Sequence, residues 1–163
     1  MLIDTPLLIV GSGPAALVVA KVAAGYGLAC LLVGHEVIGG DGAVPLAADA
    51  LAELERHGLV DILRPYLDPV DPPTITPRAF EDVLKHHCVA DLNATVYDQM
   101  AVVERVPARR GLHAVLTDGT TRWELSADMF VDARLLPSDL SAAITTGAAA
   151  ALEALDAQAR ATG

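Results

Sequence analysis

The sequence has 163 residues, of which 53% are hydrophobic, 20% are charged and only 4% are aromatic. This length suits one domain with a sizeable core, so we expect residues 1–163 to form a single unit built mainly from aliphatic side chains. The net charge of −10 argues against nucleic acid and anionic membranes as partners, because both select clustered lysine and arginine.

The N-terminal residues and the cysteines indicate the compartment. The N-terminus lacks a basic segment, and no apolar run reaches the ~18 residues of a membrane span. Cys30 and Cys88 are the only cysteines, and they form no C-x-x-C pair, which argues against a thiol–disulfide centre or a thiolate zinc site. We therefore expect a cytoplasmic protein with reduced thiols.

The first part of the chain alternates apolar runs with glycine. Residues 7–10 (LLIV) predict a strand buried on both faces, residues 14–27 predict a helix of small side chains, and residues 28–34 predict a second buried strand. A strand, a helix and a strand within so few residues form a parallel crossover unit.

The middle of the chain is less regular. We expect a glycine-rich loop over residues 34–45, an amphipathic helix over 46–58 and a proline-rich connector over 63–73. A further helix is predicted over 76–88, with Thr76 as its N-cap and an apolar stripe through Phe80, Val83, Leu84 and Cys88.

The last part of the chain is rich in short β-type runs. Residues 94–99, 101–106, 111–119 and 121–133 predict an antiparallel meander that ends in a returning core strand, and residues 137–161 predict one long alanine-rich helix. The predicted fold class is therefore α/β: a Rossmann-like parallel sheet with an antiparallel meander and a C-terminal helix.

Residues 11–16 (GSGPAA) match the pattern G-x-G-x-x-G/A directly between a strand and a helix. Gly11 allows a tight turn, Gly13 lets the backbone approach a pyrophosphate, and Ala16 is small enough for close helix–strand packing. The N-terminus of the following helix favours negative charge. The pattern favours dinucleotide binding, and the alternative is that the small residues serve packing alone.

Other polar residues are weaker candidates. His35 and Glu36 follow the second strand and read as an acid–base pair, a ribose contact or simply a polar loop start. His86, His87 and Cys88 are adjacent, and neighbouring helical residues point about 100° apart, so we expect no metal site. No residue stands out as a catalytic nucleophile or base.

The order of elements resembles the FAD-binding domain of the glutathione-reductase-like flavoproteins. IVGSGPAAL is similar to their first FAD motif, HEVIGG to their glycine loop, and ADMFVDAR to their A-D-x-V-V-D-A-R-G strand. The two segments LAELERHGLVDIL and ITPRAFEDVL resemble the stretch before the meander in aromatic hydroxylases and lycopene cyclases. The tail AAITTGAAAALEALDA resembles the last helix of thioredoxin reductases, whose N-terminus faces the flavin.

Two positions depart from that family. Its second strand ends in an acidic residue that binds the adenosine ribose, whereas this chain has Gly34 there, and Glu36 is the nearest substitute. The aspartate of its late G-D motif aligns with Arg134, and Asp139 is the next carboxylate. Arg134 is suited to pairing with a phosphate.

A third departure is that the NAD(P)H or substrate domain of the family is absent between residues 134 and 140. We expect the face that this domain covers to be open, and large exposed apolar patches are uncommon in monomers. A homo-oligomer or a partner protein is therefore expected, unless the loop 35–48 covers the face.

The resemblance implies a minimal FAD-type dinucleotide-binding protein that acts in redox chemistry as a dimer or with a partner chain. Two alternatives remain: a non-catalytic subunit that has lost its cofactor, and a cofactor-independent cyclase or isomerase that uses the cleft. The expected cofactor-binding residues are Gly11, Ser12, Gly13, Pro14, Ala15, Ala16, Gly34, His35, Glu36, Gly39, Gly40, Val102 and Arg134.

Overall fold

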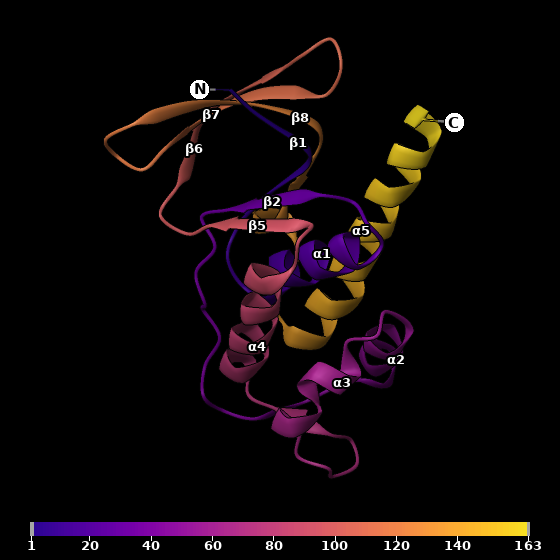
Figure 1. Ribbon diagram of the computed structural model, residues 1–163. Coiled ribbons are helices and arrows are strands. Elements are labelled where there is room, and N and C mark those ends of the chain that lie inside the picture. Colours follow the sequence, from indigo (N-terminus) through magenta and orange to yellow (C-terminus); the bar gives the residue numbers. More distant parts are fainter. Residues whose placement is uncertain (1, 163) are drawn as a thin grey trace.

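The computed structural model describes residues 2–162 and centres on a six-stranded sheet in the order β5-β2-β1-β8-β7-β6 (Figure 1). The strands are β1 (Leu2–Val10), β2 (Cys30–Val33), β5 (Ala94–Tyr97), β6 (Ala101–Pro107), β7 (Leu112–Thr117) and β8 (Arg122–Asp132). A second, two-stranded sheet joins β3 (Val44–Pro45) to β4 (Thr74–Ile75). The helices are α1 (Pro14–Gly25), α2 (Ala48–Arg56), α3 (Val60–Leu63), α4 (Pro77–Ala90) and α5 (Leu140–Thr162).

The sheet combines two kinds of pairing. Strands β5, β2, β1 and β8 run parallel, and β8 also pairs antiparallel with β7, which pairs with β6. One long strand therefore belongs to both the parallel sheet and the meander. This arrangement confirms the predicted fold class, with a Rossmann-like parallel part, a meander and a C-terminal helix.

One prediction about an individual segment is wrong. The run 94–99 was expected in the meander, but β5 pairs parallel with β2, because α4 returns the chain to that edge and makes a second crossover. Short helical turns over Val60–Leu63 and Arg64–Tyr66, at the start of the connector 63–73, were not predicted. Helix α4 agrees with prediction: it begins at Pro77, and the Thr76 hydroxyl accepts the Ala79 N–H at 3.1 Å.

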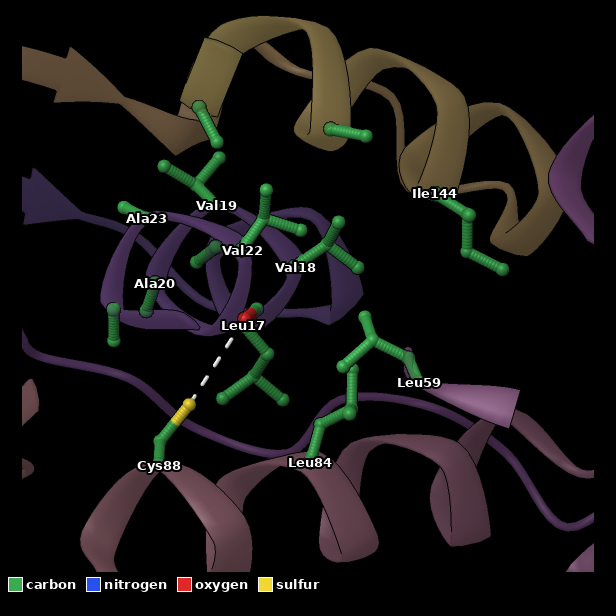
Figure 2. Close-up of a cluster of buried hydrophobic side chains, with 14 of the residues drawn as sticks. Leu17, Val18, Val19, Ala20, Val22, Ala23, Leu59, Leu84, Cys88 and Ile144 are labelled. Carbon is green, nitrogen blue, oxygen red and sulfur yellow. Dashed lines mark hydrogen bonds between the residues drawn. The ribbon is translucent and has the colours of Figure 1, made fainter. Parts of the chain in front are cut away.

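Helix α1 is the centre of the larger core. Leu17 points toward Leu84 and Cys88 of α4, while Val18 and Val22 point toward α5 (Figure 2). Helix α5 approaches α1 closely at Gly147, where a Cβ atom would lie 3.0 Å from the Ala15 carbonyl oxygen. The helices thus bury one face of the sheet, and α1 is held between its neighbours with its N-terminus at the sheet edge.

The opposite face of the sheet has a smaller core. Residues of β1 and β2 pack there against the inward side chains of the meander: Leu8, Val10, Leu31 and Val33 meet Leu112, Ala114, Leu116, Leu125 and Ala127. Within residues 2–162, no helix is both long enough and apolar enough to cross a lipid bilayer.

Candidate functional site

A cleft of about 450 Å³ opens at the carboxyl ends of the parallel strands, beside the first turn of α1. This is the edge at which open α/β sheets bind ligands. Six of the predicted cofactor residues line it: Gly11, Ser12, Pro14, Gly34, Val102 and Arg134. The structure adds apolar walls that the sequence analysis did not single out, among them Val10, Val33, Ile38, Met100, Ala133 and Leu136.

The other predicted residues lie around the cleft but outside its lining. Ala15 and Ala16 are buried in the first turn of α1, and His35 is fully buried. Glu36, Gly39 and Gly40 belong to the loop after β2, and Gly13 lies beneath the side chain of Ile38, which a Cβ atom on Gly13 would meet at 3.0 Å.

The glycine turn fits tightly against the end of β8. Gly11 has φ +142°, and a Cβ atom there would lie 3.0 Å from both the Ala133 Cβ and the Arg134 backbone nitrogen. Gly13 has φ +89°, a conformation that side chains disfavour. Glycine is therefore required at both positions, and the turn and the segment that carries Arg134 form two walls of one cleft.

Hydrogen bonds join this turn to the loop after β2. The Ser12 hydroxyl donates to the Gly34 carbonyl at 3.3 Å and accepts the Glu36 N–H at 3.1 Å. The Gly13 N–H donates to the Glu36 carbonyl at 3.2 Å. One amide of the turn is thus already bonded within the chain.

The buried side chain of His35 also links the loop after β2 to the glycine turn. Its Nε2 lies 2.9 Å from the Gly13 carbonyl oxygen, which can only accept, so Nε2 carries the proton. Burial lowers the pKa of the imidazole below 6.5, and its Nδ1 has no hydrogen-bond partner. For His35, the hydrogen bond to Gly13 and the burial of the ring favour a polar loop start that anchors the turn.

The backbone conformation at Gly34 disfavours the acidic side chain that the resembled flavoproteins carry at this position. Its φ is +71°, and a Cβ atom would lie 3.0 Å from the Met100 carbonyl oxygen. An aspartate or glutamate at this position would be strained and crowded. Glu36 is exposed and two residues further along, so it is the first carboxylate available to the mouth of the cleft.

Glu81 of α4 holds the glycine loop and was missed by the sequence analysis. Its side chain is fully buried, its Oε1 accepts the Ile38 N–H at 3.2 Å, and its Oε2 has no hydrogen-bond partner. The only sequence signal was an acidic residue beside Phe80 on the apolar stripe of the helix. Glu81 thereby supports Ile38, which covers Gly13 and lines the cleft.

The Glu81 carboxyl is expected to make stability depend on pH. Burial raises its pKa above the ordinary value of 4.5, with Asp82 adding to the increase and both the Ile38 N–H and Arg78 opposing it. The folded protein therefore binds the Glu81 proton more tightly than the unfolded chain does. The stability that this tighter binding adds is fully present below pH 4.5 and is lost as pH rises from 4.5 through the folded pKa.

As pH rises from 4.5 through the folded pKa of Glu81, we expect the wild-type protein to lose free energy of unfolding relative to a Glu81→Gln variant, which has no carboxyl to titrate. Urea unfolding at a series of pH values measures the difference. The control is Glu153→Gln at an exposed position of α5. Parallel pH profiles for wild type and Glu81→Gln would contradict this role for Glu81.

Arg134 is the charged group of the cleft lining. Asp132 holds its guanidinium through two hydrogen bonds, Nε to Oδ1 at 2.8 Å and a second nitrogen to Oδ2 at 2.9 Å. These bonds lower the pKa of the Asp132 carboxyl. The Arg134 side chain is 63% exposed, so it is accessible to a ligand while being held in position.

The structure offers no alternative metal chemistry among residues 2–162, where no group of three or more His, Cys, Asp or Glu side chains is arranged to hold an ion. The rings of His86 and His87 are nearly perpendicular, with centroids 5.9 Å apart. Both cysteines are buried, and burial raises the pKa of each thiol to about 12, which makes them unreactive near neutral pH.

No protein-family model matches the sequence, and no curated protein is similar enough to count as a relative. Solved structures do share the fold. The p-nitrophenol 4-monooxygenase of Pseudomonas putida matches with a TM-score of 0.64 at 15% identity, covering 80% of this chain and 40% of that one. The anhydrotetracycline hydroxylase OxyS of Streptomyces rimosus matches with a TM-score of 0.66 at 17% identity, covering 80% and 31%.

A third match is the flavin-dependent monooxygenase PieE, solved in complex with FAD and substrate, with a TM-score of 0.64 at 18% identity and coverage of 78% and 30%. The chain spans less than half the length of each of these enzymes. Over the part that it matches, the chain has the fold of the FAD-dependent monooxygenases.

Proposed function

We propose that this chain binds a dinucleotide of the FAD type in the cleft and takes part in redox chemistry. The observation that carries the proposal is the juxtaposition of Gly11 and Ser12, just before α1, with Arg134, just after β8. This places the N-terminus of a helix and a guanidinium, both of which attract phosphate, around one cleft.

The residues present fit such a ligand, with one change from the usual arrangement. The first-turn amides of Ala15 and Ala16 have no partner within the helix, so they are the donors left for a pyrophosphate once the Gly13 amide bonds to Glu36. Gly39 and Gly40 would flank the phosphates. Glu36, rather than a residue at Gly34, would be the carboxylate for the ribose.

The apolar side of the cleft is suited to packing against the flat ring system of a flavin. Met100, Val102 and Leu136 contribute apolar surface on one side of the cleft. A flavin bound there would supply the electron transfer, since the lining residues include no histidine, cysteine or carboxylate. The residues of this chain would bind the cofactor and orient it.

The test is the visible spectrum of the purified protein, followed by reconstitution with FAD and titration of flavin fluorescence. We expect binding, and we expect Gly13→Val to weaken it at least tenfold, because a side chain there is strained and would displace Ile38. Gly25→Ala is the control, since a Cβ atom at Gly25 meets nothing within 4 Å. Colourless protein that FAD cannot reconstitute would refute the proposal.

A second candidate, a flavoprotein-fold subunit that has lost its cofactor, is favoured by one observation: the Gly13 amide is already bonded to Glu36. Failure of reconstitution, with the protein folded, would select this candidate or the cofactor-independent enzyme. The homo-oligomer or partner chain expected from the missing domain stays a prediction, as does the assignment of residues 1–163 to one domain.

A further inference from the structure

Two helices meet at their C-terminal ends, remote from the cleft. Helix α1 ends at the cap residue Tyr26 and α2 ends at the cap residue His57. Each cap is followed by a glycine of positive φ, Gly27 or Gly58. In each case the glycine and the next residue donate their N–H groups back to the helix, at distances between 2.8 and 3.1 Å, as in the Schellman motif. The two cap side chains are therefore held on rigid backbone.

The side chains at these caps form a hydrogen-bonded relay. The Tyr26 hydroxyl lies 2.9 Å from Nδ1 of His57, and Nε2 of His57 lies 3.2 Å from a carboxylate oxygen of Glu53. The carboxylate can only accept, so Nε2 carries the proton of the neutral ring. Nδ1 is then an acceptor, and the Tyr26 hydroxyl donates to it.

The surroundings favour proton transfer along this relay. The His57 side chain is only 2% exposed, whereas Tyr26 is 54% exposed. The imidazole thus sits shielded between a phenol that reaches solvent and a carboxylate. A nucleophile, a base and a group that orients the base are the parts of an activated nucleophile.

We propose that Tyr26 is an activated nucleophile that accepts an acyl group from activated acyl esters, with His57 as its general base and Glu53 as the positioning residue. The phenol oxygen forms a bond to the acyl carbon while His57 Nδ1 takes the phenol proton. The bond from the acyl carbon to the leaving alkoxide or phenoxide breaks, and His57 returns the proton to the leaving group. The product is an O-acyl ester at Tyr26.

This site is independent of the proposed cofactor cleft. The cleft lies at the first turn of α1 and Tyr26 at its last, so the 12-residue helix separates them by about 18 Å. Occupancy of the cleft is therefore not required for acylation, and a failed FAD titration leaves this proposal standing.

The test treats the full-length protein with p-nitrophenyl acetate and maps acetylation of each tyrosine by peptide mass spectrometry over time. Tyr66 is an internal reference, because it is 55% exposed and, within residues 2–162, has no hydrogen bond to a histidine. General-base assistance is worth roughly 10²-fold or more, so we expect Tyr26 to react about 100-fold faster than Tyr66. Equal rates at the two tyrosines in the wild-type protein would overturn the proposal without any variant.

Variants separate the roles within the relay. His57→Gln keeps a hydrogen-bonding side chain without a base, and we expect it to reduce the Tyr26 rate to that of Tyr66. Glu53→Gln should lower the rate at Tyr26 and leave the rate at Tyr66 unchanged. Arg56→Ala removes the ion pair of Glu53 on the same helix but not its bond to His57, and should leave the Tyr26 rate intact. An undiminished rate in His57→Gln would exclude His57 as the base.

Discussion

A Gly39→Ala variant is expected to unfold roughly 5 °C or more below the wild-type protein, from a steric cost of about 1–3 kcal/mol. A Cβ atom at Gly39 would lie 2.3 Å from the Glu81 Oε2 and 2.7 Å from both the carbonyl carbon and the Cβ of Pro77. The carboxylate is fully buried and Pro77 begins α4, so neither neighbour can move aside without disturbing the core.

The next residue provides a matched control. A Cβ atom at Gly40 would meet nothing within 4 Å, and its backbone is outside the positive-φ region. Gly40→Ala should therefore change the unfolding temperature by less than about 2 °C, as expected for an exposed position. Thermal unfolding followed by circular dichroism compares the two variants. If both alanines are tolerated equally, the loop does not pack against α4 as the structure shows.

Local rules were sufficient for the features that lie within short segments. The glycine turn, its strand and helix α1 follow from a pattern of neighbouring residues, and the start of α4 follows from Thr76 and Pro77. The edge of the sheet that carries the cleft was also predictable, because the carboxyl ends of parallel strands define it. These inferences needed no knowledge of distant contacts.

The features that could not be predicted depend on contacts between residues that are far apart in the sequence. Residues 94–97 have the character of any half-buried strand, and only their position beside β2 assigns them to the parallel sheet. Glu81 lies 43 residues from the Ile38 amide that it binds, and His57 lies 31 residues from Tyr26. Gly34 looked like the simple loss of a carboxylate, whereas its positive φ and the nearby Met100 carbonyl, which only the structure reveals, disfavour an acidic side chain at this position.

The proposed ligand site makes opposite predictions for two neighbouring residues. Replacing Arg134 by alanine removes the guanidinium from the cleft lining, and hydrogen bonds to charged groups contribute about 1.5–3 kcal/mol each. Because the side chain is 63% exposed, screening by solvent and salt reduces this value. We therefore expect FAD affinity to fall about tenfold at low ionic strength, and by less at high salt.

Asp132→Asn should act in the opposite direction. The asparagine retains an oxygen that can accept the Arg134 backbone N–H, now 3.1 Å from Oδ1, but removes the negative charge that competes with a phosphate for the guanidinium. We expect FAD affinity to rise a few-fold, again mainly at low salt. Fluorescence titrations at two salt concentrations measure both variants. A ligand that binds through Arg134 must respond with opposite signs to the two substitutions, whereas general damage to the cleft would weaken binding in both.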